Sequence, residues 1–110
     1  NDINNCVGDC PFPKGYVFSY NNSVAGYAMV AKNFSTEFGK PCIWIEDIFV
    51  KQEFQGKGIG TRFLDYIEQK YPNRIFRLEV EKYNRNAIKL YKKSGYDFLP
   101  YMEMKKDVKP

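Results

Sequence analysis

The stretch QGKGIGT, residues 55–61, decides the fold, because the hydrophobic pattern changes its period there. Before it, residues 43–50 (IWIEDIFV) form an apolar run of strand length. After it, apolar residues recur every four positions, which predicts a helix over residues 58–70. Glycines on alternate positions leave backbone N–H groups open to a ligand, and the helix N-terminus behind them adds partial positive charge. The stretch therefore predicts a phosphate-binding loop.

The remaining helices and strands are predicted in the same way, from the hydrophobic periodicity and from the Gly and Pro residues that interrupt it. Upstream, strands are predicted over 16–20, 24–31 and 43–50, with a loop at 34–41. Downstream, the pattern predicts a strand over 75–80, a helix over 84–94 and one or two closing strands over 96–105, bent at Pro100. The fold class is α/β (α+β), with a mixed, mostly antiparallel sheet in the order β-β-β-α-β-α-β. Residues 1–15 are predicted to be irregular, 16–106 to form one domain and 107–110 a tail.

Composition limits the function classes. The chain has 110 residues, 44% of them hydrophobic and 27% charged, as expected for a folded globular domain. It contains no apolar run of membrane-span length and no signal-peptide pattern at its first residue, so we expect a cytoplasmic protein with no membrane partner. Histidine is absent, which excludes imidazole acid–base chemistry. Proton transfer must then use carboxylate, Tyr, Lys, Cys or water.

The cysteine count and the net charge further limit the cofactors and partners that we expect. The three cysteines, Cys6, Cys10 and Cys42, are too few for a disulfide framework, so we expect free thiols and no metal site. The net charge is +4, from 17 basic and 13 acidic residues, and the two signs are interleaved. This balance allows a polyanionic ligand, and we expect no nucleic-acid partner.

Two nucleotide-binding motifs fit the loop poorly. A Walker A loop requires Gly-Lys-Ser/Thr, whereas Lys57 is followed by Gly58. The dinucleotide fingerprint requires G-x-G-x-x-G, and the spacing here is G-x-G-x-G. Glu79 does lie about twenty residues downstream, where a ribose-binding acid could be. The antiparallel strands upstream, however, do not form the βαβ unit that this motif needs.

The motifs instead resemble those of a known family. Q-x-x-G-x-G at residues 55–60 resembles the acyl-CoA pyrophosphate loop of the GCN5-related N-acetyltransferases (GNAT). N-x-x-A-x-x-L-Y-x-K-x-G-Y at residues 84–96 is similar to the second-helix segment of the same family. I-E-D-I-F-V at residues 45–50 looks most like the diamine acetyltransferases of the spermidine/spermine and thialysine types. The resemblance covers nearly all of residues 16–105.

The resemblance implies an enzyme that uses acetyl-CoA as co-substrate. It would transfer the acetyl group to a primary amine of a small, cationic, diamine-like substrate by direct attack. Two alternatives stay open: a peptide or protein amine as acceptor, and a non-catalytic acyl-CoA-binding module.

Catalytic roles are implied for two residues. Tyr91 matches the family tyrosine that protonates the CoA sulfur, although a tyrosine at helical spacing also commonly packs in the core. Glu46 and Asp47 are neighbours on a predicted strand and should face opposite sides, so only one can face the acceptor. By resemblance this is Glu46, as a base acting through water and an anchor for a cation. For Asp47 we expect pairing with a nearby Lys or Arg.

The acetyl-CoA contacts implied by the resemblance lie on the third strand, the glycine loop and the second helix. They are Ile48, Phe49, Val50, Gln55, Gly56, Lys57, Gly58, Ile59, Gly60, Thr61, Asn84 and Ala87. Asn84 also suits the N-cap of its helix. Basic residues that could assist with the CoA phosphates are Arg62, Lys89, Lys92 and Lys93. Glu79 and Glu81 could make the acceptor side more acidic, but they are interpreted as surface residues.

The family normally has a strand and two helices before the strand that begins here at Tyr16. Such a segment takes roughly 30–40 residues at mean element lengths, and fifteen precede Tyr16. We therefore expect the N-terminal strand and helix pair to be missing. Either the chain is a trimmed fragment, or a second subunit in a homodimer covers the gap.

Overall fold

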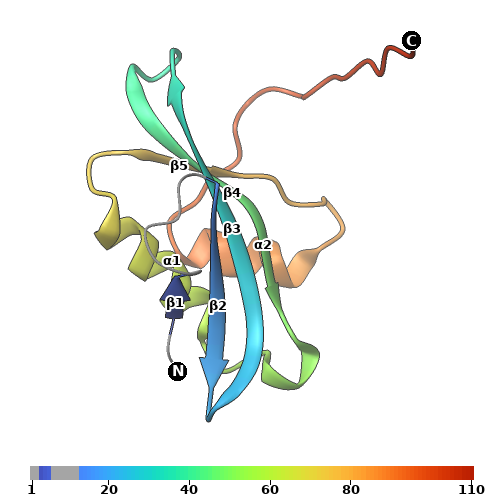
Figure 1. Ribbon diagram of the computed structural model, residues 1–110. Coiled ribbons are helices and arrows are strands. Elements are labelled where there is room, and N and C mark those ends of the chain that lie inside the picture. Colours follow the sequence, from blue (N-terminus) through green and yellow to red (C-terminus); the bar gives the residue numbers. More distant parts are fainter. Residues whose placement is uncertain (1–2, 6–12) are drawn as a thin grey trace.

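The fold is a five-stranded sheet with two α-helices (Figure 1). The computed structural model describes residues 3–5 and 13–110. Its elements are β1 (Ile3–Asn5), β2 (Lys14–Tyr20), β3 (Ser23–Ser35), β4 (Lys40–Val50), η1 (Gln52–Phe54), α1 (Ile59–Lys70), β5 (Ile75–Leu78) and α2 (Arg85–Lys93). The strand order is β1-β2-β3-β4-β5, antiparallel except for the parallel β4–β5 pair. The predicted mixed, mostly antiparallel α/β class is confirmed.

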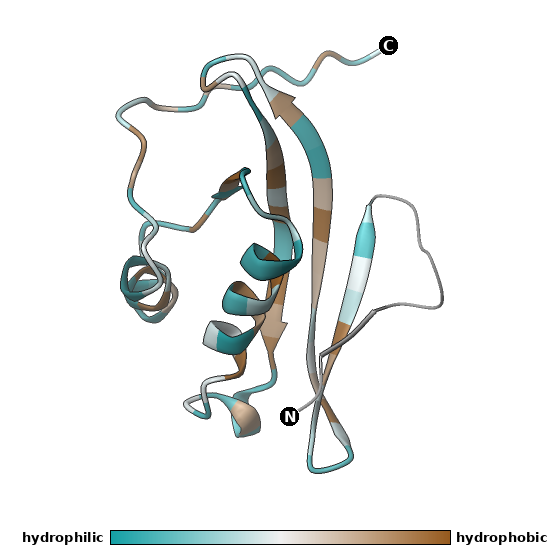
Figure 2. Ribbon diagram, turned by 90° about the vertical axis from the view of Figure 1, so that its left-hand side faces the viewer, coloured by the Kyte–Doolittle hydropathy of each residue, from teal (hydrophilic) through white to brown (hydrophobic). Residues whose placement is uncertain are grey.

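Both α-helices lie on the same side of the sheet, and the core lies between them and the strands (Figure 2). The apolar stripe of α1 is buried as its period predicts, and Phe63 packs its ring against Tyr16 and Phe18 of β2. Burying each such side chain contributes roughly 1.5–3 kcal/mol. Among the described residues, no helix is long and apolar enough to cross a membrane.

The face of the sheet away from the helices is partly open to solvent. Val17, Tyr27 and Phe49 point to this face and are 39%, 43% and 47% exposed. The rings of Tyr27 and Phe49 contact each other across the β3–β4 pair, with centroids 5.6 Å apart. A cross-strand aromatic pair of this kind stabilises the sheet without a covering layer.

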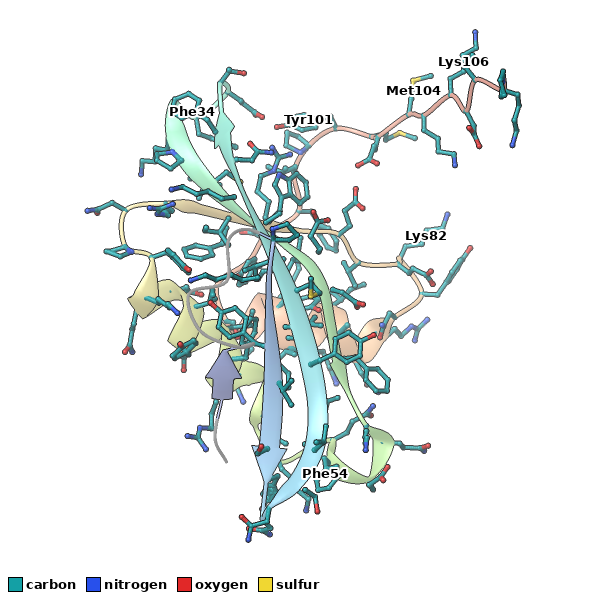
Figure 3. All side chains as sticks on the ribbon, viewed as in Figure 1. Phe34, Phe54, Lys82, Tyr101, Met104 and Lys106 are labelled. Carbon is teal, nitrogen blue, oxygen red and sulfur yellow. The ribbon has the colours of Figure 1, made fainter. Side chains whose placement is uncertain are left out.

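The predicted closing strands over 96–105 are wrong. Residues 96–110 contain no strand, and Figure 3 shows Met104 and Lys106 on a segment that runs away from the sheet. The side chain of Met104 is 93% exposed. A strand needs a partner edge, and β5 has only four residues, while Pro100 lacks the N–H that a ladder requires.

Two other predictions about irregular segments also need correction. Ile3–Asn5 pairs antiparallel with Tyr16–Phe18 of β2, so part of the predicted irregular segment 1–15 is a strand, and a first strand is not missing. Residues 6–12, with Cys6 and Cys10, lie outside the described residues. The loop predicted over 34–41 shrinks to a turn at residues 36–39, because the β3–β4 ladder extends to Ser35 and Lys40.

Gly26 sets the distance between β3 and β4. A Cβ on Gly26 would lie 2.0 Å from the carbonyl oxygen of Phe49 and 2.9 Å from the Cα of Val50. Both atoms are backbone, so they could yield only if the strand moved. The absence of a side chain at Gly26 therefore lets β4 approach β3 closely at its C-terminal end.

We expect Gly26→Ala to destabilise the fold by about 1–3 kcal/mol, the usual cost of overpacking a site that cannot relax. The measurement is chemical denaturation followed by tryptophan fluorescence or circular dichroism. Asn33→Ala, on an exposed position of the same strand, serves as the control and should change the unfolding free energy by about 0.5 kcal/mol or less. Equal effects of the two substitutions would contradict the close approach.

Candidate active site

The parallel ladder between β4 and β5 stops part-way along β4, and this opens the site. Its last pair is Ile45 with Leu78, so the following residues of the two strands are no longer joined. On the other edge of β4, Val30 pairs with Ile45 but Met29 pairs with Asp47. Glu46 is thus the extra residue of a β-bulge, which bends a strand and ends regular pairing. Beyond Glu46, one edge of β4 faces a gap.

The glycine loop closes one end of this gap. Gly56 and Gly58 both have φ of 79°, a left-handed conformation that glycine adopts readily. A Cβ on either residue would meet no atom within 4 Å, so the space above the loop is open. The side-chain amide of Gln55 donates to the carbonyl of Val50 at 3.0 Å and ties the loop to β4. The loop is therefore fixed against β4 and leaves open space above its glycines.

Helix α1 begins directly after the loop with its amides uncapped. Gly58 is the N-cap residue and has no side chain with which to cap the helix. The first amides of a helix have no acceptor within the helix, and the aligned peptide dipoles make this end positive. The amides of residues 59–61 therefore form a donor set suited to an anionic group such as phosphate.

Helix α2 forms the second wall. The side-chain oxygen of Asn84 accepts a hydrogen bond from the amide of Ala87 at 3.2 Å, which confirms the N-cap interpretation of Asn84. Gly60 lets the two helices approach, because a Cβ there would lie 3.0 Å from the side chain of Leu90. The helices are therefore held close together at the point where both border the gap.

These elements enclose a cleft of about 860 Å³. It is lined by the following predicted cofactor residues: Ile48, Phe49, Val50, Gln55, Gly56, Gly58, Ile59, Gly60, Thr61, Asn84 and Ala87. Tyr91 lines it too. Lys57 does not; its ammonium group lies over the ring of Tyr20, 5.6 Å from the centroid. The structure thus brings together all but one of the predicted cofactor residues.

Sequence reasoning missed three residues of the cleft and left two lysines undecided. Phe54, Asn86 and Leu90 also line it, as do Lys89 and Lys93. Leu90 carried a signal, since it lies three residues after Ala87 on one helical face. Phe54 carried none, because it follows β4 in the short η1 turn, at one end of the sheet (Figure 3).

Tyr91 packs in the core and also lines the cleft. Its side chain is 8% exposed and belongs to the core cluster, where its ring contacts Tyr96 at 6.1 Å between centroids. It also lines the cleft. Burial raises the pKa of Tyr91 above its ordinary value, and the negative charge of Asp47 raises it further. The phenol therefore stays protonated at neutral pH and can serve as a proton donor.

The two carboxylates on β4, Glu46 and Asp47, lie in different surroundings. Asp47 has a tyrosine as its partner, because the Tyr27 hydroxyl hydrogen-bonds to it and this contact raises the pKa of Tyr27. The expected pairing of Asp47 with Lys or Arg stays a prediction. Glu46 is exposed at the bulge, where the simple alternation of faces no longer holds, and it is not among the residues that line the cleft.

Comparison with known proteins agrees with this architecture. The model of the acetyltransferase (GNAT) family matches residues 3–96. The chain belongs to the GNAT acetyltransferase family. Within this GNAT chain the cleft, the glycine loop and Tyr91 all lie inside the matched range.

Relatives of this GNAT chain include named enzymes. Mouse thialysine N-epsilon-acetyltransferase is 34% identical over 80 residues, which cover 70% of this chain and 46% of that protein. The spermine/spermidine N(1)-acetyltransferase of Bacillus subtilis (strain 168) is 24% identical over 96 residues, covering 82% and 63%. The chain spans about half to two thirds of the length of these relatives.

Solved structures share the fold. An aminoglycoside N-acetyltransferase in complex with CoA superimposes with a TM-score of 0.76 at 13% identity, covering 90% of this chain and 78% of that one. An aminoglycoside acetyltransferase from an uncultured soil metagenomic sample, in complex with sisomicin, gives 0.75 at 17% identity, covering 87% and 66%. At such identities the likeness concerns the GNAT fold alone.

We expect Asp47→Asn to lower the pKa of Tyr91 while leaving it above the ordinary value of 10.0, because burial is the larger cause of the shift. The measurement is an NMR titration of ring-labelled tyrosine, assigned with Tyr91→Phe. Asp65→Asn, an exposed carboxylate on α1, is the control and should leave the Tyr91 pKa unchanged.

The same shift has a consequence for stability. The folded state holds the Tyr91 proton more tightly than the unfolded state does. The contribution of this proton to stability is therefore complete below pH 10 and is lost as pH rises through the folded-state pKa.

A Tyr91 titration that did not respond to Asp47→Asn would contradict the proximity of the two groups.

Proposed function

We propose that this protein is an N-acetyltransferase that transfers acetyl from acetyl-CoA to a primary amine of a small cationic substrate. The observation that carries the proposal is the cleft in which a protonated, mostly buried Tyr91 faces the open edge of β4. The relatives that act on thialysine and on spermine or spermidine support an amine acceptor with more than one positive charge.

The residues present fit an acetyl-CoA donor. The amides at residues 59–61 form an uncapped donor set, and the open space above Gly56 and Gly58 admits a bulky anion. Lys89 and Lys93, four residues apart on α2, place two cations on the same cleft. The unpaired edge of β4 offers backbone groups to an extended amide-containing chain, in the manner of strand addition.

The reaction needs few protein groups. The neutral amine nitrogen attacks the thioester carbonyl carbon, the C–S bond breaks, and the amine proton must leave while the thiolate gains one. Tyr91 can donate a proton to the sulfur, and Glu46 at the bulge is the carboxylate that we assign, through water, to the amine proton. Backbone amides along β4 can stabilise the developing oxyanion.

The two alternative functions can be told apart from the proposed one by the substrates that the protein acetylates. A peptide or protein acceptor would make N-terminal peptides better substrates than free diamines. A non-catalytic acyl-CoA-binding module would bind acetyl-CoA but acetylate no amine in a broad panel. We favour the enzyme with a small acceptor because Tyr91 lines the cleft as a protonated phenol, and because the relatives named above act on small amines.

We expect Gly58→Ala to weaken acetyl-CoA binding and Gly39→Ala to leave it unchanged. The two glycines are matched, because both have positive φ (79° and 63°) and both have no atom within 4 Å of an added Cβ. Each substitution therefore has a similar backbone cost of about 1–2 kcal/mol, but only Gly58 lines the cleft.

The measurement is thermal stabilisation by acetyl-CoA. At a hundred times the wild-type Kd, acetyl-CoA should add about 2.7 kcal/mol to the stability of the wild type and of Gly39→Ala. At the same concentration it should add clearly less to the stability of Gly58→Ala. An absence of stabilisation in the wild type would contradict the donor assignment.

We expect Tyr91→Phe to keep acetyl-CoA binding but to lower kcat roughly 10²–10⁴-fold, the usual contribution of a general acid. The assay follows CoA thiol release with an amine acceptor, and thermal stabilisation by acetyl-CoA controls for binding. Unchanged turnover would assign Tyr91 to core packing alone.

A further inference from the structure

The aromatic ring of Tyr20 lies beside the glycine loop, at the hairpin end of the sheet. Tyr20 is the last residue of β2 and pairs with Ser23 across a two-residue turn. Asn21 and Asn22, which form this turn, have φ of 50° and 64°, and a tight hairpin turn of this length favours such left-handed residues. The position of the Tyr20 backbone is therefore fixed by its own hairpin.

The Tyr20 ring contacts both segments that connect β4 to α1. Its centroid lies 5.9 Å from the ring centroid of Phe54 in η1, and the two rings are inclined at 72°. The ammonium group of Lys57, in the glycine loop, lies 5.6 Å from the Tyr20 centroid. Tyr20 and Phe54 are partly buried and pack against the core, so the ring is a fixed surface for the exposed loop.

Lys57 is the side chain through which the loop reaches this ring. Residues 56–58 are Gly-Lys-Gly, so the middle of the loop has no other side chain. Glycine restricts the backbone less than any other residue does, and a loop of this kind keeps one conformation only if something holds it. Gln55 fixes the start of the loop on Val50. Within residues 3–5 and 13–110, Lys57 forms no ion pair, so its contact with Tyr20 is the anchor for the middle of the loop.

The position of the loop determines the donor set of the cleft. Gly56 and Gly58 line the cleft, and Gly58 is also the N-cap of α1. Lys57 lies between them but does not line it, because its side chain lies on Tyr20. A shift of Lys57 would move the peptide groups on both of its sides. Amides that already point at the ligand site cost less to order when the ligand binds.

We propose that Tyr20 is a positioning residue for the donor site, whose ring holds Lys57 and so preorganises the loop for the pyrophosphate of acetyl-CoA. This inference rests on the proposed acetyltransferase function and adds to it a residue outside the cleft. Tyr20 lines neither this cleft nor a second cleft of about 710 Å³, which shares Tyr91 with the first. It therefore acts through Lys57, by a cation–π contact, without touching the ligand.

The first test measures the Kd of acetyl-CoA by titration calorimetry. Tyr20→Leu removes the ring and should raise Kd roughly two- to fivefold, the size expected for an exposed cation–π contact. Tyr20→Phe keeps the ring face and should retain the wild-type Kd. A Tyr20→Leu variant with the wild-type Kd would overturn the proposal, and so would a Tyr20→Phe variant as weak as Tyr20→Leu.

A double-mutant cycle with Lys57→Met separates positioning from packing. Methionine keeps an unbranched side chain but leaves the ring no cation to hold. In the Lys57→Met background, Tyr20→Leu should therefore change Kd by less than about twofold. A rise as large as the one in the wild-type background would assign Tyr20 to core packing alone and overturn the proposal.

The second test observes the loop without ligand. Backbone order parameters of Gly56 and Gly58, from NMR relaxation, should fall in both Tyr20→Leu and Lys57→Met. The matched control is Tyr83→Leu, because the ammonium of Lys82 lies 5.3 Å from the Tyr83 centroid and neither residue lines a cleft. This variant should change neither the loop nor the Kd.

The outcomes separate this proposal from the proposed function. Wild type that binds acetyl-CoA, together with unchanged loop order in Tyr20→Leu, would overturn the positioning role and leave the acetyltransferase proposal standing. A wild type that does not bind acetyl-CoA would overturn both. If Tyr20→Leu does not fold, Lys57→Met, on an exposed loop, tests the same contact, and unchanged order parameters in it would overturn the role of Tyr20.

Discussion

The end of the β4–β5 ladder is the constraint on which the site depends. Parallel pairing joins the strands only up to Ile45 and Leu78, and the bulge at Glu46 turns the rest of β4 away. Without this separation, β5 would occupy the edge of β4, and the two helices would have no cleft to border. The divergence also explains why functional groups gather here, since backbone polar groups that lose their ladder partners become available to a ligand.

Two close backbone approaches hold the separated elements in place. Gly26 lets β3 support β4 just where β4 has lost its partner on the other side. Gly60 lets α2 pack against the first turn of α1, so that the amides of α1 and the lysines of α2 face one cleft. A side chain at Gly26 would have to move the backbone of β4, whereas one at Gly60 would have to displace the side chain of Leu90, which also lines the cleft.

The sequence predicts what depends on local pattern and fails where the outcome depends on distant partners. Helix α1, the N-cap at Asn84 and the left-handed loop follow from period and residue type, and all are observed. The bulge at Glu46 could not be predicted, because it exists only in the register between β3 and β4. The closing strands were predicted wrongly for the same reason: residues 96–105 have strand-like composition but form no ladder. The interpretation of Glu79 as a surface residue is confirmed, because its side chain is exposed.

Charge is distributed unequally about Tyr91. On one side lie the helix N-terminus, Lys89 and Lys93, with no carboxylate in the lining of that cleft. On the other side, the lining carries both signs: Glu68, Glu79, Asp97 and Glu103 together with Arg74, Arg77 and Lys92. A net charge of +4 does not reveal this arrangement, because it sums groups that the fold has separated. The positive charge gathered on the first cleft would attract the polyanionic donor of the proposed function. Tyr91 lines both clefts and lies at their junction.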